Sequence, residues 1–211
     1  MRNIVVLIVV TLICHPIQSF AYTPEEGKIT AAFGPYISRT NYQGLPSVRE
    51  PSYLGGVSLI AVGDISSSGS LEIAMIYLPS MLFYREDSGM ATLQSVQVMH
   101  ISMGYRWWLS PYLSTSLAFY SAYSIGEYSI VHSDFTPRDL LDTSARDATE
   151  YGFDGSVQVE LFQTDKWAAV TEARYSRSVT SKNNEQSDQY GIMIGLRYQV
   201  QTEKNVEKRP E

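Results

Sequence analysis

Apolar and polar residues alternate with a period of two along several stretches of this chain, and this pattern constrains the fold more than any other feature. Near the C-terminus, Ile192, Ile194 and Leu196 lie on one side of an extended chain. Gly191 and Gly195 lie on the other side. Successive side chains of a β-strand point to opposite faces, so the alternation predicts strands with one apolar face. Beyond the N-terminal segment no apolar run has the roughly 20 residues that a transmembrane helix needs, and an all-β protein is expected.

The repeated alternation predicts eight strands, each about ten residues or longer, which is enough for a tilted strand to cross a bilayer. They span residues 27–38, 53–63, 70–84, 94–107, 112–125, 151–163, 167–178 and 188–200. Tight turns and longer connections alternate between them. Outer-membrane barrels have an even number of antiparallel strands, short periplasmic turns and longer external loops. The sequence therefore predicts an eight-stranded, antiparallel, up-and-down transmembrane β-barrel with both termini in the periplasm.

The N-terminal segment has the features of a secretory signal peptide. Arg2 gives it a positive start, an apolar run of about a dozen residues follows, and Ser19 and Ala21 fit the positions that signal peptidase reads. A retained membrane anchor is the alternative, but the apolar run is too short for a spanning helix. We predict a signal peptide over residues 1–21, a barrel over residues 22–200 and a disordered periplasmic tail over residues 201–211.

Charge and cysteine content exclude several classes of function. Removal of residues 1–21 leaves 15 basic and 22 acidic residues, because Arg2 is the only charge removed. This acidic balance argues against nucleic acid as a partner. The single cysteine, Cys14, lies in the removed segment, so neither a disulfide framework nor a cysteine metal site is available. The two remaining histidines are far apart in sequence, and we expect no metal and no cofactor.

Aromatic residues gather at both ends of the predicted strands. Trp107, Trp108 and Trp167 fall at the ends that carry the tight turns. At the opposite ends the sequence predicts a tyrosine girdle that comprises Tyr36, Tyr53, Tyr123, Tyr151, Tyr175 and Tyr190. Amphipathic rings are enriched at the two membrane–water boundaries. This placement favours a membrane barrel over a soluble periplasmic carrier of the lipocalin-like type, whose strands show the same alternation.

The polar faces of the strands carry few charges, of both signs, among small residues. These charged residues are Glu72, Arg106, Asp154, Glu160, Glu172, Arg174 and Arg197. The interior of an eight-stranded barrel is only wide enough for side chains, and an unpaired buried charge is very costly. We therefore predict that these seven residues form a network of paired charges inside the barrel.

Given its signal peptide, alternating strands and aromatic belts, the chain resembles the small outer-membrane barrels of the OmpA-transmembrane-domain, OmpX and OmpW type. The resemblance covers residues 22–200. It implies a monomer in the outer membrane of a Gram-negative bacterium, in contact with lipid and lipopolysaccharide, and assembly by the barrel-assembly machinery. That machinery reads an aromatic residue near the C-terminus, for which Tyr198 is the best match. The implied role is structural, surface contact or narrow passage for small solutes.

Two short motifs raise an enzymatic alternative. His100 and Ser102 resemble the His-x-Ser of PagL-type lipid A deacylases, in which the serine is the nucleophile and the histidine its base. However, Met103 stands where that family has asparagine, and Tyr112 stands at the position of its glutamate. The run 132–134, His-Ser-Asp, has the residue types of the palmitoyl-transferring PagP barrels, but three consecutive residues rarely converge. We therefore expect no catalytic site.

Arginines are frequent in the predicted outer loops. They are Arg39, Arg49, Arg85, Arg138 and Arg146. Arginine binds phosphate well, so contact with lipopolysaccharide is one interpretation. Ordinary surface charge is the other.

Overall fold

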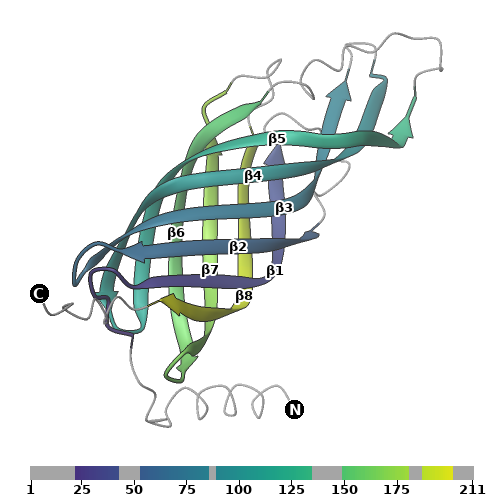
Figure 1. Ribbon diagram of the computed structural model, residues 1–211. Helices are drawn as coiled ribbons and strands as arrows, with labels where there is room; N and C mark the ends of the chain where they lie inside the picture. The colour runs from purple at the N-terminus through teal and green to yellow at the C-terminus, as the bar shows by residue number, and fades with distance from the viewer. Residues whose placement is uncertain (1–21, 43–52, 86–88, 135–148, 181–186, 202–211) are drawn as a thin grey trace, which may run out of the picture.

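The structure is a computed structural model in which residues 22–42, 53–85, 89–134, 149–180 and 187–201 are described. These residues form eight strands: β1 (Ile29–Tyr42), β2 (Leu54–Asp64), β3 (Gly69–Arg85), β4 (Ala91–Ser110), β5 (Leu113–Ser133), β6 (Glu150–Gln163), β7 (Trp167–Ser178) and β8 (Ser187–Gln201). Each strand pairs antiparallel with the next, and β1 also pairs with β8, so the sheet closes into a barrel (Figure 1). The predicted all-β, eight-stranded antiparallel meander is confirmed. The predicted signal peptide and the tail beyond residue 201 lie outside the described residues.

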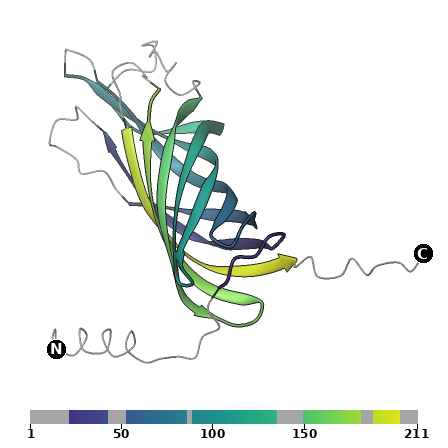
Figure 2. The ribbon, with the colours of Figure 1, turned by 90° about the vertical axis from the view of Figure 1, so that its left-hand side faces the viewer.

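The two ends of the barrel differ in the length of their connections. At one end, which we call the short-turn end, the strands are joined through residues 65–68, 111–112 and 164–166. Strand β1 begins and β8 finishes at this end (Figure 2). Tyr22, the first described residue, also lies there, since it forms a hydrogen bond with Asp64 at the end of β2. At the other end, the long-connection end, up to 16 residues separate consecutive strands, as between β5 and β6.

The outer surface of the barrel is apolar along the strands. Outward side chains such as Phe33, Phe119 and Ile194 are 59%, 50% and 63% exposed. The alternate residues are buried inside, and most of them are small, polar or charged. This distribution is the reverse of that in a protein surrounded by water, and it is the one expected when hydrocarbon surrounds a closed barrel.

None of the described segments forms a helix of the length and apolar character needed to cross a membrane. The β-strands satisfy each other's backbone groups around the whole circumference, and closure leaves no open sheet edge along the paired segments.

Strands β3, β4 and β5 extend farther toward the long-connection end than β2 and β6, which flank them (Figure 1). The prediction that β5 finishes at residue 125 is wrong, because the strand continues to Ser133. Gly126 has φ of 75°, in the left-handed region that glycine adopts without steric cost. The register with β4 shifts around this residue. A bulge of this kind inserts extra residues and bends the strand without ending it.

Candidate functional site in the barrel interior

The barrel interior contains a central ion cluster formed by five charged side chains from four strands. Its members are Glu72 from β3, Arg106 from β4, Asp154 from β6, and Glu172 and Arg174 from β7. Each lies at an inward position of its strand because the side-chain period of a strand is two residues. All five are at most 2% exposed. Buried charges of this kind are tolerated only when they are paired and hydrogen-bonded.

Arg174 lies between three carboxylates. Its guanidinium is 2.7 Å from Glu72, 2.8 Å from Glu172 and 2.9 Å from Asp154. Arg106 forms ion pairs with the same two glutamates. Its Nε donates to Glu72 over 2.6 Å, and Nη2 donates to Glu172 over 2.5 Å. Both glutamates are thus shared by the two arginines, which links β3, β4 and β7 across the interior.

Serine hydroxyls complete the coordination of the arginines. Arg106 Nη1 donates to Ser114 over 2.8 Å, and Arg174 Nη1 donates to Ser102 over 3.0 Å. The hydroxyls of Ser116 and Ser156 lie 2.7 Å apart on adjacent strands. These small side chains leave room for the large guanidinium groups within a narrow barrel.

His100 and Ser102 do not form a nucleophile–base pair. His100 Nε2 lies 2.8 Å from Asp154 Oδ2, and its ring stacks on Tyr120 with centroids 4.3 Å apart. The Ser102 hydroxyl accepts a hydrogen bond from the Arg174 cation, and a donor at this oxygen cannot remove its proton. Both residues are at most 2% exposed, so neither faces a surface that a lipid substrate could reach.

The His-Ser-Asp run at the end of β5 lies at the surface. His132 Nε2 lies 3.0 Å from Asp134 Oδ1, and both side chains are about half exposed. This nitrogen is therefore engaged by the carboxylate two residues along the chain. The described residues contain no group of three His, Cys, Asp or Glu side chains that could hold a metal ion.

The other part of the interior is apolar. A cluster of buried side chains from β1, β2, β3, β7 and β8 fills it: Ala32, Tyr36, Ile60, Val62, Ala74, Ile76, Leu78, Ala168, Val170 and Met193. The interior is therefore divided between charged and apolar packing. Well-packed apolar side chains exclude water from the space they occupy.

Tyr36 belongs to this apolar cluster, so its prediction as a girdle residue is wrong. It is 2% exposed, whereas its odd-numbered neighbours Phe33 and Ile37 face outward. Its ring lies over Gly191 of β8, where a Cβ atom would collide with it. The absence of a side chain at Gly191 is what makes room for an inward tyrosine.

Tyr22 closes the interior at the short-turn end. Its side chain is 3% exposed, and its ring packs on Trp108 with centroids 4.5 Å apart and on the Arg197 guanidinium at 4.1 Å. Its hydroxyl donates to Asp64 over 2.6 Å. Burial, and next the hydrogen bond to the Asp64 carboxylate, raise the pKa of the Tyr22 phenol above its ordinary value. The phenol therefore remains a hydrogen-bond donor at neutral pH.

Trp108 is the second exception to the predicted girdle. It points inward at the short-turn end, where Nε1 donates to Ser70 over 2.9 Å, and Ser70 donates in turn to Asp64 over 2.6 Å. Its neighbour Trp107 points outward and is 42% exposed. Adjacent residues of a strand face opposite sides, so only one of the two can contact lipid.

The remaining girdle residues lie at outward positions. Trp107, Trp167, Tyr53, Tyr123, Tyr151 and Tyr175 are exposed, and Tyr190 is partly exposed. The two remaining predicted charges, Glu160 and Arg197, lie apart from the central ion cluster and pair with each other over 2.5 Å.

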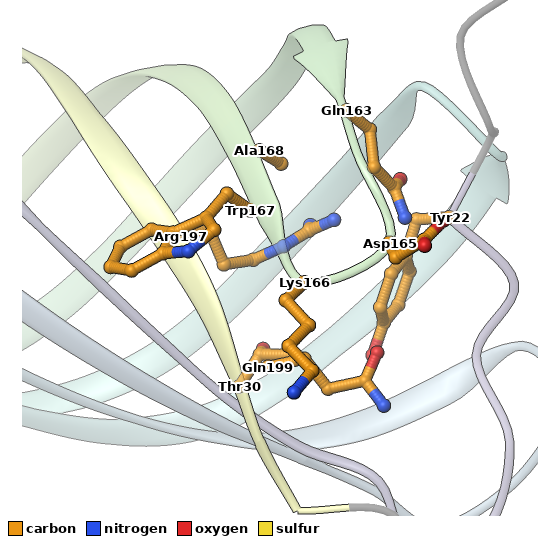
Figure 3. Close-up of a pocket in the computed structure, with 9 residues that line it drawn as sticks. All are labelled: Tyr22, Thr30, Gln163, Asp165, Lys166, Trp167, Ala168, Arg197 and Gln199. Atoms are coloured by element: carbon orange, nitrogen blue, oxygen red, sulfur yellow. The ribbon is translucent and has the colours of Figure 1, made fainter.

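A small pocket opens beside Arg197 at the short-turn end (Figure 3). Its volume of about 10 Å³ accommodates about one water molecule. Arg197 Nη1 and Thr30 Oγ1 are buried and make no hydrogen bond to the described residues. A water molecule held between them would satisfy both atoms, but the pocket is too small for an organic ligand.

The apolar exterior, the closed sheet and the filled, partly charged interior together define a transmembrane β-barrel of the small outer-membrane type. No family model matches the chain, and no curated protein sequence matches it. Among solved structures the fold is similar to that of the outer membrane protein OprG from Pseudomonas aeruginosa, with a TM-score of 0.57, 8% identity, and coverage of 85% of this chain and 99% of OprG.

A second similar structure is Ail, the attachment invasion locus protein of Yersinia pestis, solved with the heparin analogue sucrose octasulfate. Its TM-score is 0.50 at 9% identity, and the match covers 82% of this chain and 100% of that one. Identities this low show a shared fold and nothing more. The predicted resemblance to small eight-stranded outer-membrane barrels is confirmed at that level.

Proposed function

We propose that the protein is a monomeric barrel of a Gram-negative outer membrane with a sealed interior, and that it has a structural or surface-contact role. The observation that carries this proposal is the filled interior. The central ion cluster occupies one part, the apolar cluster occupies another, and Tyr22 covers the short-turn end. An interior filled in this way would leave no continuous aqueous path through the described part of the barrel, which a narrow-passage role would require.

The proposed orientation places the short-turn end in the periplasm and the long connections outside. The unequal connections support it, because short turns are periplasmic in bacterial outer-membrane barrels. In this orientation both termini are periplasmic, after export by the signal peptide. The proposed partners are outer-membrane lipid, lipopolysaccharide and the barrel-assembly machinery, with no role for nucleic acid.

The enzymatic alternative has little support in the site geometry. His100 faces Asp154, and Ser102 accepts a hydrogen bond from Arg174, so the pair lacks the alignment of a nucleophile with its base. A soluble carrier is also disfavoured, since outward residues such as Leu117 (55% exposed) and Ile194 (63% exposed) would face water.

Conductance across a planar lipid bilayer tests the sealed interior. Purified, refolded wild-type protein should insert, as shown by a heat-dependent shift in gel mobility, and yet give no reproducible stepwise conductance. A general porin serves as the positive control. Reproducible open-channel steps from the wild-type barrel would contradict the proposal, and recovery of the protein in the soluble periplasm would contradict the membrane location.

A second measurement separates the enzymatic alternative. Lipid A from cells with and without the protein should have the same acyl pattern by mass spectrometry. A changed pattern that Ser102→Ala abolishes would show that the protein modifies lipid A.

A further inference from the structure

Tyr22 is buried at the short-turn end, although the predicted cleavage after Ala21 would make it the first residue of the mature chain. Chain termini are usually poorly ordered unless specific contacts hold them. The Tyr22 ring contacts Trp108 and the Arg197 guanidinium. Its hydroxyl donates to Asp64. The residue at which the mature chain is expected to begin is therefore inserted into the mouth of the barrel.

The segment that follows Tyr22 is folded against the end of β2. Gly27 N donates to the Asp64 carbonyl over 3.0 Å, and Asp64 N donates to the Lys28 carbonyl over 2.9 Å. Glu25 N donates to the Asp64 carboxylate over 3.2 Å. Gly27 has φ of 86°, which allows the chain to turn from this segment into β1. These contacts hold the main chain next to Tyr22 as well as its ring.

The carboxylate of Asp64 makes no ion pair with the described residues. It is 3% exposed and accepts hydrogen bonds from two hydroxyls and one main-chain amide, all of which are neutral donors. The cations nearby are paired with other acids: Lys28 with Glu25, and Arg197 with Glu160. A buried carboxylate without a counter-charge is costly, so a further positive charge at this end of the barrel would stabilise the fold.

Two oxygen acceptors share the small pocket at the short-turn end with Tyr22. They belong to Gln163 and Asp165, close to the turn between β6 and β7. Figure 3 shows the Gln163 side chain pointing toward Tyr22. Gln163 Oε1 is buried and accepts no hydrogen bond from the described residues, whereas buried acceptors normally have a partner. Asp165 is exposed and adds a negative charge to the same pocket.

We propose that removal of the predicted signal peptide makes Tyr22 an N-terminal plug, and that its α-ammonium is bound by Gln163 Oε1 and the Asp165 carboxylate. Hydrolysis of the peptide bond between Ala21 and Tyr22 consumes one water, leaves a carboxylate on the released segment and leaves an ammonium on Tyr22. An α-amino group is largely protonated at neutral pH. It has three donors where the uncleaved chain has one amide N–H, and it brings a positive charge to the end that holds Asp64.

The inference rests on the proposed function, because it requires export and cleavage of the signal peptide. In this arrangement the chain binds its own new terminus, and cleavage completes the closure of the short-turn end. The ring of Tyr22 fills the mouth, and the ammonium fixes the main chain beside it.

The reactivity of the α-amine tests the proposal. The first residue of protein purified from outer membranes is identified by its intact mass. An amine-reactive ester then labels the folded protein and the guanidinium-unfolded protein, and peptide mass spectrometry gives the labelling rate of the Tyr22 α-amine in each. The folded α-amine should react about tenfold or more slowly than the unfolded one, as expected for charge-assisted contacts. Gln163→Leu with Asp165→Asn should remove most of this protection.

Two further proteins make the test specific. Asp188→Asn with Gln189→Leu is the matched control, because it changes the same residue types on β8 at the long-connection end, and it should keep the protection of the wild type. A refolded chain that begins one residue earlier, at Ala21, carries its ammonium beyond the site and should react at the unfolded rate.

Four results would overturn the plug: full reactivity of the folded wild-type α-amine, unchanged protection in the Gln163 and Asp165 variant, an equal loss in the control, or protection of the chain that begins at Ala21. Each variant is first checked for the heat-dependent gel shift. Asp165→Asn alone changes an exposed side chain and replaces the double variant if that protein does not fold.

The first residue separates failure of the plug from failure of the proposed function. An outer-membrane protein that begins at a residue other than Tyr22 contradicts the plug only. A protein that retains residues 1–21, or that is absent from the outer membrane, contradicts the proposed function.

Discussion

Substitution of Arg174 by methionine is the most direct test of the central ion cluster. The Arg174 side chain is fully buried and lies within 2.9 Å of three carboxylates. Methionine keeps much of its length and removes its charge. Arg106 and His100 then remain opposite Glu72, Glu172 and Asp154, which leaves at least one buried carboxylate without a full counter-charge.

Breaking a buried ion pair by removing one partner costs about 3–5 kcal/mol. We expect Arg174→Met to lower the free energy of unfolding by this amount, which reduces the folding equilibrium constant by about two to four orders of magnitude. Guanidinium unfolding in phosphatidylcholine vesicles, followed by tryptophan fluorescence, measures the change. The matched control is Arg177→Met on the same strand, whose exposed pair with Asp188 should contribute about 0–1 kcal/mol.

A double-mutant cycle adds a second readout. Replacement of Arg174 takes one counter-charge away from the Glu72 carboxylate. Glu72→Gln removes that carboxylate charge, so in the Arg174→Met background it should recover part of the lost stability. Coupling energies between such contacting residues are about 0.5–3 kcal/mol. The reasoning fails if Arg174→Met costs no more than Arg177→Met, or if the two central substitutions are simply additive.

Three further predictions concern packing, the short-turn end and the girdle. Gly104→Ala should cost about 1–3 kcal/mol in vesicle unfolding, since its Cβ would collide with the β5 backbone, whereas Gly155→Ala meets no neighbour and should be neutral. Tyr22→Phe should cost about 1–3 kcal/mol through its lost hydrogen bond to a buried carboxylate. The pKa of Tyr22 is raised in the fold, so the stability difference between the wild type and Tyr22→Phe should have its full value below pH 10 and shrink as the pH rises further. Measurements of unfolding free energy across that pH range would show this. Brominated lipids should quench the fluorescence of Trp167 but not of Trp108, and equal quenching of single-tryptophan variants would contradict their assignment to opposite faces.

Much of the fold could be predicted because a membrane barrel repeats one simple pattern. The strand predicted over residues 167–178 has the bounds of β7, and its inward side is the one that carries Glu172 and Arg174. Charge identified the inward face, since a charged side chain facing lipid would be costly at mid-membrane. The bulge at Gly126 escaped prediction because glycine also marks ordinary loops, and the sequence pattern does not distinguish a bent strand from its end.

Whether an aromatic side chain points inward or outward was harder to predict, because an aromatic ring can pack equally well against lipid and inside the barrel. The sequence did contain a usable signal. Trp107 and Trp108 are adjacent and must face opposite sides, and Tyr36 shares its parity with Gly34 and Ser38 rather than with the outward Phe33. Parity along each strand was therefore a better guide than the position of an aromatic residue near a strand end.

The specific pairs of the ion cluster could not be predicted from the pattern. His100 meets Asp154, which is 54 residues away, and Arg174 meets Glu72 at a separation of 102 residues. Such contacts depend on the stagger of several strands at once. Local sequence specifies which face a residue occupies, but only closure of the sheet decides which residues meet inside.

The inverted distribution of side chains has a consequence for how this chain can change over evolutionary time. Outward positions such as Leu117 and Ile194 contact fluid lipid, where one apolar side chain serves nearly as well as another. Inward positions such as Arg106 are tied to several partners and can change only together. Half of each strand can thus vary freely while the other half can change only as a group, and two barrels can share this shape at an identity as low as the 8% between this chain and OprG. Substitutions that such a barrel tolerates inside should therefore occur as correlated changes between inward positions.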